Sequence, residues 1–369
     1  MSEPLSKIPG GMRYYFGAEA RLRRAVENTA MSVFDGWSYE EVTTPSVDYY
    51  ALFERGMGHS EAHRSFRLTD TDGRLLALRP DVTSSAARAA ATLFAERARP
   101  LRLCYAANVF RQQPRSHAEW RRESTQLGCE LIGAGGATAD IEVLLIAAEI
   151  LQKLNLSDFC ITLSSVEVFN GVAASLNFDE TKRAEMQRLI DMKDATELQK
   201  FLAPYAPPGE IAAFARLTRL SGKSRVIDEA REVITNARSV AALRELENLW
   251  RVIESLDLTE LFEIDLGDVS GLDYYTGLIF KIYLSGAGGR VGRGGRYDNL
   301  TENFGRAEPA IGFVLDLDAI TDVLARGGFN FAQDSESGVT ILGSDDDASL
   351  FLKAKEQRAR DEKIKISDK

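Results

Sequence analysis

The chain has 369 residues, of which 44% are hydrophobic and 27% are charged, and its formal net charge is −10. This length suits one large domain with attachments or two domains, and the composition is ordinary for a soluble globular protein. The acidic balance counts against a protein whose main task is to grip nucleic acid. The sequence shows neither a signal peptide nor an apolar run of membrane-spanning length, so we expect a cytoplasmic protein without membrane contact.

The first half of the chain mixes helix and strand patterns. Apolar residues at helical spacing predict helices over 17–34, 80–94 and 138–154. Runs of β-forming residues predict strands within 36–50, 101–112, 121–134 and 159–172, and a hairpin over 65–79 that turns at Asp72-Gly73.

The second half begins with a charged, almost purely helical stretch over about 177–256, which we interpret as an inserted helical subdomain. Strand patterns return at 261–284, and the glycine-rich run 286–298 is interpreted as a turn between strands. A strand that leads into a helix follows at 310–320, and 338–366 has the pattern strand, helix, strand. We therefore expect an α+β fold with a mainly antiparallel sheet in domain 1–325, and a short α/β segment over 326–369.

The few cysteines and histidines do not indicate a metal or redox site. The three cysteines form no CxxC pair, so Cys104, Cys129 and Cys160 are interpreted as small buried hydrophobic residues. His59 and His63 have helical spacing but no adjacent carboxylate or cysteine, which favours a surface or loop position. We expect neither a metal nor a cofactor.

Six segments in order resemble the catalytic core of class II aminoacyl-tRNA synthetases, in its histidyl branch. They extend over roughly residues 8–325, and they are GWSYEEVTTP (36–45), ALRPDVTSSAAR (77–88), NVFRQQPRSHAEWRRESTQLGCELIG (108–133), GLDYYTG (271–277), GGRYDNL (294–300) and AIGFVLDLDAI (310–320). The resemblance implies a class II synthetase-like antiparallel sheet flanked by helices. It also implies a homodimer, because the first of these motifs makes the dimer interface in this class.

Three charged groups of the synthetases are absent from this chain. The resemblance places Ser270 where the histidyl enzymes carry an arginine that holds the substrate carboxylate and the displaced phosphate. Gln113 stands in place of an ATP-binding glutamate, and Ala319 in place of an ATP-binding arginine. Positioned charges of this kind supply roughly 10²–10³ in rate each. We therefore expect that synthetase activity is lost.

This combination resembles the regulatory subunits of ATP phosphoribosyltransferase, the first enzyme of histidine biosynthesis. Only about 45 residues follow the last motif, so the anticodon-binding domain of roughly 100 residues is expected to be absent. The resemblance implies a short-form catalytic subunit as partner, L-histidine as effector, a homodimer within a larger hetero-oligomer, and no tRNA. Two alternatives stay open, a histidine-binding synthetase paralogue with another partner and a truncated histidyl-tRNA synthetase.

The resemblance also implies which residues hold histidine. Two of them, Gln126 and Glu130, lie four apart, so on one strand they would share a face. The implied roles are the ammonium for Asp81, Thr83 and Gln126, the carboxylate for Arg111, the imidazole for Glu130 and Tyr275, and the pocket walls for Tyr274 and Tyr297.

Each assignment has a simpler structural alternative. Asp81 can merely complement the N-terminus of a helix, and Glu130 can be a solvated strand residue, although its apolar neighbours argue for a partner. If Tyr274 and Tyr275 lie on a strand, only one of them faces the pocket, and we favour Tyr275. The glycine-rich run can be a flexible turn or a phosphate-binding loop, and its arginines, including Arg293, can face an acidic partner.

Overall fold

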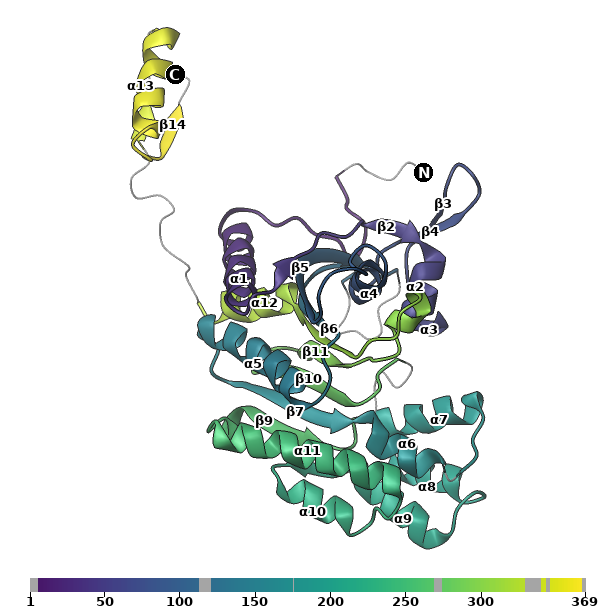
Figure 1. The fold of residues 1–369 in the computed structure, drawn as a ribbon. Helices are drawn as coiled ribbons and strands as arrows, with labels where there is room; N and C mark the ends of the chain where they lie inside the picture. Colours follow the sequence, from purple (N-terminus) through teal and green to yellow (C-terminus); the bar gives the residue numbers. More distant parts are fainter. Residues whose placement is uncertain are drawn as a thin grey trace. The chain divides into compact units, whose positions relative to one another are not determined.

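A nine-stranded, mostly antiparallel sheet forms the centre of the unit Met1–Leu324 (Figure 1). The computed structural model describes residues 6–112, 121–174, 176–268, 274–328, 340–342 and 346–366. The chain forms two compact units, Met1–Leu324 and Ala325–Lys369, and the sheet belongs to the first.

The strand order in the sheet differs from the order in the sequence. Only β1 with β5 and β7 with β9 pair in parallel, and the other neighbours in the sheet are antiparallel. In sheet order the strands are β1 (Glu40–Glu41), β5 (Leu101–Phe110), β6 (Glu123–Ile132), β12 (Ala310–Asp316), β11 (Arg290–Arg296), β10 (Leu278–Leu284), β7 (Phe159–Ser165), β9 (Phe262–Asp265) and β8 (Ser221–Gly222). The expectation of a mainly antiparallel α+β fold is confirmed.

Helices α1 (Gly17–Gly36) and α5 (Ala137–Lys153) pack on one face of the sheet. In α1 the buried residues Leu22, Val26, Ala30 and Val33 recur every three or four positions, which forms the apolar stripe that a packed helix needs. Phe34 contacts Phe313 of β12, with ring centroids 6.1 Å apart. The opposite face of the sheet is left for α4 (Thr83–Ala91) and for the side chains of the candidate site.

A small three-stranded sheet precedes α4. Its strands are β2 (Val47–Tyr49), β4 (Leu75–Leu78) and β3 (Arg67–Thr69), in that order. The hairpin between β3 and β4 turns through Gly73 at φ +83°, a conformation that glycine adopts without steric cost. Short helices α2 (Tyr50–Met57) and α3 (His59–Ala62) lie beside it, and His63, which follows α3, is exposed.

The glycine-rich run was wrongly interpreted as a turn over its whole length. Residues 290–296 form β11, an interior strand between β10 and β12. Here glycine meets a packing need, because a Cβ on Gly294 would lie 2.4 Å from the Phe280 ring, and one on Gly292 would lie 2.7 Å from Leu315. Only the residues before β11 make the connection from β10.

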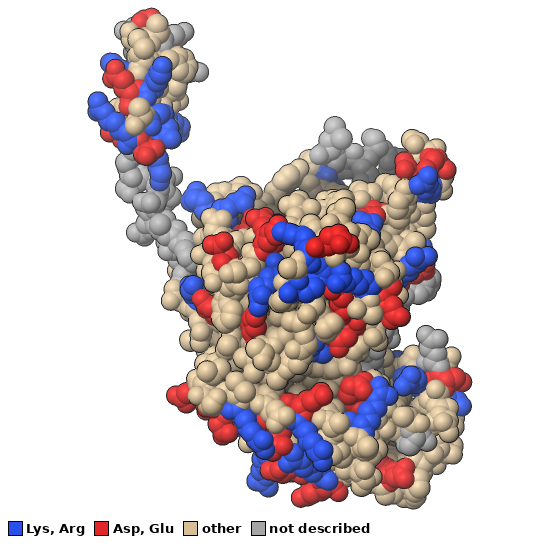
Figure 2. Space-filling view, viewed as in Figure 1, with Lys and Arg blue, Asp and Glu red and all other residues tan. Residues whose placement is uncertain are grey.

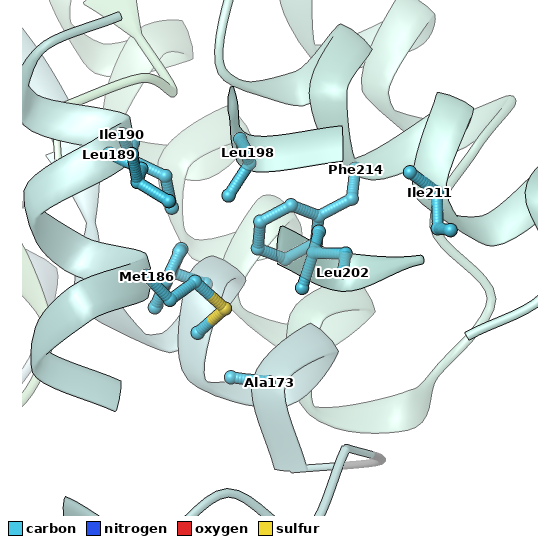
Figure 3. Packing of buried hydrophobic residues seen from close by; sticks show 9 residues of the cluster. Ala173, Met186, Leu189, Ile190, Leu198, Leu202, Ile211 and Phe214 are labelled. Atoms are coloured by element: carbon cyan, nitrogen blue, oxygen red, sulfur yellow. The ribbon is translucent and has the colours of Figure 1, made fainter. Parts of the chain in front are cut away.

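The charged stretch after β7 folds into a helical layer, as expected. Figure 1 shows these helices gathered beside the β7–β9 end of the sheet. They are α6 (Val166–Ala174), α7 (Glu180–Asp191), α8 (Ala195–Leu202), α9 (Pro208–Leu217), α10 (Arg225–Arg231) and α11 (Ala237–Ser255). Figure 3 shows buried residues from α6, α7, α8 and α9, such as Met186, Leu198 and Phe214, converging on a core of their own. Because α7 contributes to this core, its position within the helical layer is fixed by packing.

The remaining elements complete the two units. In the first, the one-turn helices η2 (Thr259–Leu261) and η3 (Thr301–Phe304) and helix α12 (Leu317–Arg326) follow strands or precede them. The second unit has the predicted strand, helix and strand, which are β13 (Thr340–Leu342), α13 (Asp347–Arg358) and β14 (Ile364–Ile366). Among the described residues, no helix is both long and apolar enough to cross a membrane.

Charged side chains of both signs are intermixed on the face that Figure 2 shows. A band of Lys and Arg crosses the middle of the first unit there, with Asp and Glu directly beside it. The helical layer shows the same alternation. This face therefore offers no extended surface of a single sign.

Candidate functional site

Three glycines leave room on the sheet face opposite α1. A Cβ on Gly312 would lie 1.9 Å from the Glu130 carboxylate, and one on Gly128 would lie 2.7 Å from the Tyr105 hydroxyl. A Cβ on Gly295 would lie 2.9 Å from the Tyr275 ring. The side chains of Glu130, Tyr105 and Tyr275 thus lie directly over these three glycines. A larger residue at any of the three positions would displace the side chain above it.

Two adjoining cavities lie over this face. The outer cavity has a volume of about 630 Å³ and extends to α7, and the inner cavity has a volume of only about 10 Å³. Glu130 and Tyr297 line the inner cavity alone, whereas Arg188 and Lys281 line the outer one alone. Six residues line both, which are Asp81, Thr83, Tyr274, Tyr275, Arg293 and Gly294.

The inner cavity is closed to a ligand ring in this conformation. A volume of about 10 Å³ accommodates no more than one water molecule. An imidazole that approaches Glu130 therefore needs neighbouring side chains to move. The tyrosines that line both cavities are the groups in its path.

Glu130 is the most strongly constrained group of the site. It is 1% exposed, accepts a hydrogen bond of 2.9 Å from the Tyr105 hydroxyl, and accepts another from the Tyr297 hydroxyl. Burial raises its pKa to about 7, against the opposing effect of hydrogen bonds from Tyr297, Thr83 and Tyr105, and the nearby Asp81 raises it further. The carboxylate is therefore an acceptor whose charge is only partly compensated.

Asp81 and Gln126 form a second polar group, of which Asp81 lines both cavities and Gln126 lines neither. Asp81 Oδ1 accepts the backbone N–H of Thr83 at 2.8 Å, and Asp81 Oδ2 lies 3.5 Å from the Gln126 amide nitrogen. The side-chain oxygen of Gln126 is buried and has no hydrogen-bond partner. Asp81 thus does complement a helix N-terminus, yet it also faces the cavities beside an unsatisfied acceptor, which suits a ligand with several N–H donors.

Tyr274 and Tyr275 do not lie on a strand, so the expectation that only one of them faces the pocket was wrong. They precede β10 in an irregular segment, and both line both cavities. Their ring centroids are 4.2 Å apart, and Tyr274 lies 6.2 Å from Tyr297. Strand alternation does not apply to a turn, and the two rings lie against each other as a pair.

Of the two positions that the resemblance assigns to ATP, Ala319 is described by the structure, and it lines neither cavity. Arg111 follows β5 and lines neither cavity. Burial and Asp318 raise the pKa of Asp316 to about 6, while Arg121 and Arg111 lower it. Ala319 lies in α12, and its backbone N–H donates a hydrogen bond of 3.0 Å to Asp316 Oδ1. Gln113 and Ser270 lie outside the described residues.

Arg293 also lines the site, although the sequence did not indicate it as a binding residue. It lies on β11 opposite Lys281 of β10 and Val314 of β12, and it lines both cavities. Burial lowers its pKa, but Tyr274, Tyr275, Asp81 and Glu61 outweigh that effect and raise it. Arg293 and Gly295 lie two residues apart on β11 and therefore share a face of the sheet. A strand prediction for this run would have placed Arg293 on the site face.

Comparison with known families identifies two related groups. A family model described as histidyl-tRNA synthetase matches residues 11–320. The chain is 35% identical to the ATP phosphoribosyltransferase regulatory subunit of Moorella thermoacetica, over 96% of this chain and 90% of that protein. It is 32% identical to the protein of the same name from Clostridium kluyveri, over 90% and 86% of the two chains.

Solved structures agree with the fold. An ATP phosphoribosyltransferase regulatory subunit/histidyl-tRNA synthetase from Bacillus halodurans has a TM-score of 0.87 and 28% identity, and covers 100% of this chain and 94% of its own. A histidyl-tRNA synthetase from Nostoc has a TM-score of 0.80 and 21% identity, over 100% of this chain and 87% of its own. The predicted class II synthetase-like fold is confirmed.

Proposed function

Because the chain belongs to the family of ATP phosphoribosyltransferase regulatory subunits, we propose that it activates a short-form catalytic subunit and transmits feedback inhibition by histidine. The name of the relatives implies a catalytic partner, and it places the protein in histidine biosynthesis. The chain itself has a regulatory rather than a catalytic part in this reaction.

The observation that carries the histidine proposal is the arrangement of acceptors around the two cavities. The buried Glu130 carboxylate provides an anionic acceptor for an imidazole N–H, and Asp81 with the unsatisfied Gln126 oxygen provides acceptors for an ammonium. Thr83, Tyr274, Tyr275 and Tyr297 add hydroxyls and ring walls. Histidine presents both kinds of donor at opposite ends.

Inhibition needs two states that histidine binds with different affinity. The inner cavity in this conformation is too small for the ring, so it corresponds to a state that binds histidine poorly. We infer that histidine favours a second state in which the Tyr274–Tyr275 pair has moved away from Glu130. The same coupling free energy then links histidine binding to the catalytic partner, in both directions.

A homodimer is part of the proposal, and one exposed apolar surface supports it. Val47, Tyr49 and Leu68 lie on one face of the small sheet and are 39%, 43% and 40% exposed. Clustered exposure of this kind is typical of an interface. Light scattering on the purified chain should therefore give twice the monomer mass of 40.7 kDa, and a monomer mass would contradict the dimer.

The alternative of a truncated synthetase predicts an activity that we expect to be absent. Purified protein should give no histidine-dependent ATP–pyrophosphate exchange, and Ser270→Arg alone should not create it, because Gln113 and Ala319 still lack the charges that hold ATP. An active histidyl-tRNA synthetase serves as the positive control of the assay. Exchange by the wild-type chain would contradict the regulatory function.

A further inference from the structure

The residues that the resemblance assigns to histidine binding bring no cation to the cavity walls that could bind the carboxylate of an amino acid. Position 270 is a serine, and Arg111 lines neither cavity. An amino acid nevertheless carries a carboxylate next to its ammonium, and a carboxylate taken out of water needs a cation or several N–H donors. An amino acid can therefore bind here only if another residue of the cavity walls provides such a cation.

Arg293 differs from the paired cations near the cavity walls because its side chain forms no direct hydrogen bond or ion pair among the described residues. Lys281, its cross-strand neighbour, forms an ion pair of 2.7 Å with Asp268. Arg188 forms one of 2.7 Å with Glu185, and Arg296 of the same strand as Arg293 is paired with Asp140. Within the described parts of the chain, Arg293 has neither a hydrogen bond nor an ion pair. A partly buried guanidinium that makes no direct hydrogen bond can offer its N–H groups to a ligand anion.

The nearby acid does not neutralise this guanidinium directly. Asp81 lines the same two cavities as Arg293, but the two side chains form no ion pair. Asp81 is instead held by the Thr83 N–H, beside the unsatisfied oxygen of Gln126. Arg293 and Asp81 thus face the same two cavities without forming an ion pair, and their opposite charges match those of an α-amino acid.

We propose that Arg293 binds the α-carboxylate of the amino-acid ligand, in place of the arginine that is absent from position 270. The guanidinium offers two parallel N–H groups to the carboxylate, and Asp81 and Gln126 accept from the ammonium. A phosphate is a poorer match, because Asp81 would repel its second charge. The proposal rests on the proposed histidine site and names the group that selects a free amino acid over an amine.

The test compares two ligands that differ only in the carboxylate. Histidine has it and histamine does not, and isothermal titration calorimetry gives the affinity of the wild-type protein for each. A charge-assisted contact should make histidine bind about 10- to 100-fold more tightly than histamine. Inorganic phosphate, titrated separately, shows whether the guanidinium merely takes up any anion.

The variant Arg293→Met should remove this preference. Histidine should bind it about 10- to 100-fold more weakly than it binds the wild type, whereas the affinity for histamine should not fall, since histamine has no carboxylate to lose. Arg290→Met is the matched control, because Arg290 lies on the same strand but lines the outer cavity only. It should leave the preference for histidine unchanged.

The outcomes separate the two proposals. If wild type binds histidine and histamine equally, or if Arg293→Met keeps the preference, the role of Arg293 is overturned while the histidine site stands. If wild type binds no imidazole ligand, the histidine site itself fails. Should Arg293→Met not fold, as circular dichroism would show, Arg293→Lys takes its place, and a reduced but remaining preference there supports the proposal.

Discussion

Replacing Glu130 with glutamine is expected to stabilise the unliganded protein at pH 8 and to weaken its binding of histidine. Glu130 is buried, and its pKa is raised to about 7 from an ordinary 4.5. Above pH 7 the folded state must hold a buried negative charge, which costs roughly 3 kcal/mol for a shift of this size. Glutamine has the same shape and avoids that charge.

The stabilisation by Glu130→Gln should depend on pH, because the charge of Glu130 does. Since the pKa is raised in the folded state, the native protein binds the proton more tightly than the unfolded chain does, and stability falls as the pH rises from about 4.5 to about 7. The stability difference between Glu130→Gln and wild type should therefore be near zero at about pH 4.5 and about 1–3 kcal/mol at pH 8. Urea denaturation at the two pH values measures it.

Binding should change in the opposite direction. Glutamine offers the imidazole a neutral acceptor in place of an anionic one, so calorimetry at pH 8 should show histidine affinity about 10- to 100-fold lower. Glu123→Gln is the matched control on the same strand, since Glu123 bonds Asn108 at the surface and lines neither cavity. A pH-independent loss of stability in Glu130→Gln, with histidine binding unchanged, would contradict the role given to this carboxylate.

Replacing Asp81 with asparagine should separate activation from inhibition. Asparagine keeps an oxygen for the Thr83 N–H, so the start of α4 is preserved, but the anionic acceptor for the ammonium is lost. The concentration of histidine that inhibits the assembled complex by half should rise about 10- to 100-fold. The rate without histidine should stay at the wild-type level.

Asp179→Asn is the control for this second variant. Asp179 also accepts a backbone N–H at a helix start, that of Lys182 at 2.8 Å, but it is exposed and lines neither cavity. It should change neither the rate nor the inhibition. Undiminished inhibition of the Asp81→Asn complex would mean that effector histidine binds elsewhere, for instance at the junction with the catalytic chain.

The sequence predicted the fold well because its signals are local and repeated. The hairpin at Asp72-Gly73 and the amphipathic α1 each appeared at their expected places. The prediction for the glycine-rich run was wrong because glycine is common both in turns and in strands that neighbouring side chains approach closely. Only the contacts with the adjacent strands distinguish these two cases. Gly294 lies beneath Phe280, which no local pattern reveals.

The candidate site was predictable only in part, for a related reason. The apolar setting of Glu130 indicated a buried carboxylate with a partner. Its partners are far apart in the sequence, because Tyr105 lies on β5 and Tyr297 directly follows β11. Arg293 was overlooked once its strand was taken for a turn. The size of the inner cavity depends on how Tyr274 and Tyr275 pack, and side-chain packing between distant segments is not encoded in any single motif.

If this protein controls a catalytic partner in response to histidine, the reaction of that partner should show it. The most direct test is the rate at which a short-form catalytic chain condenses ATP with phosphoribosyl pyrophosphate, with and without this protein, across histidine concentrations. We expect that the protein raises the rate and that histidine then suppresses it. No change in rate, together with no co-purification of the two chains, would contradict it.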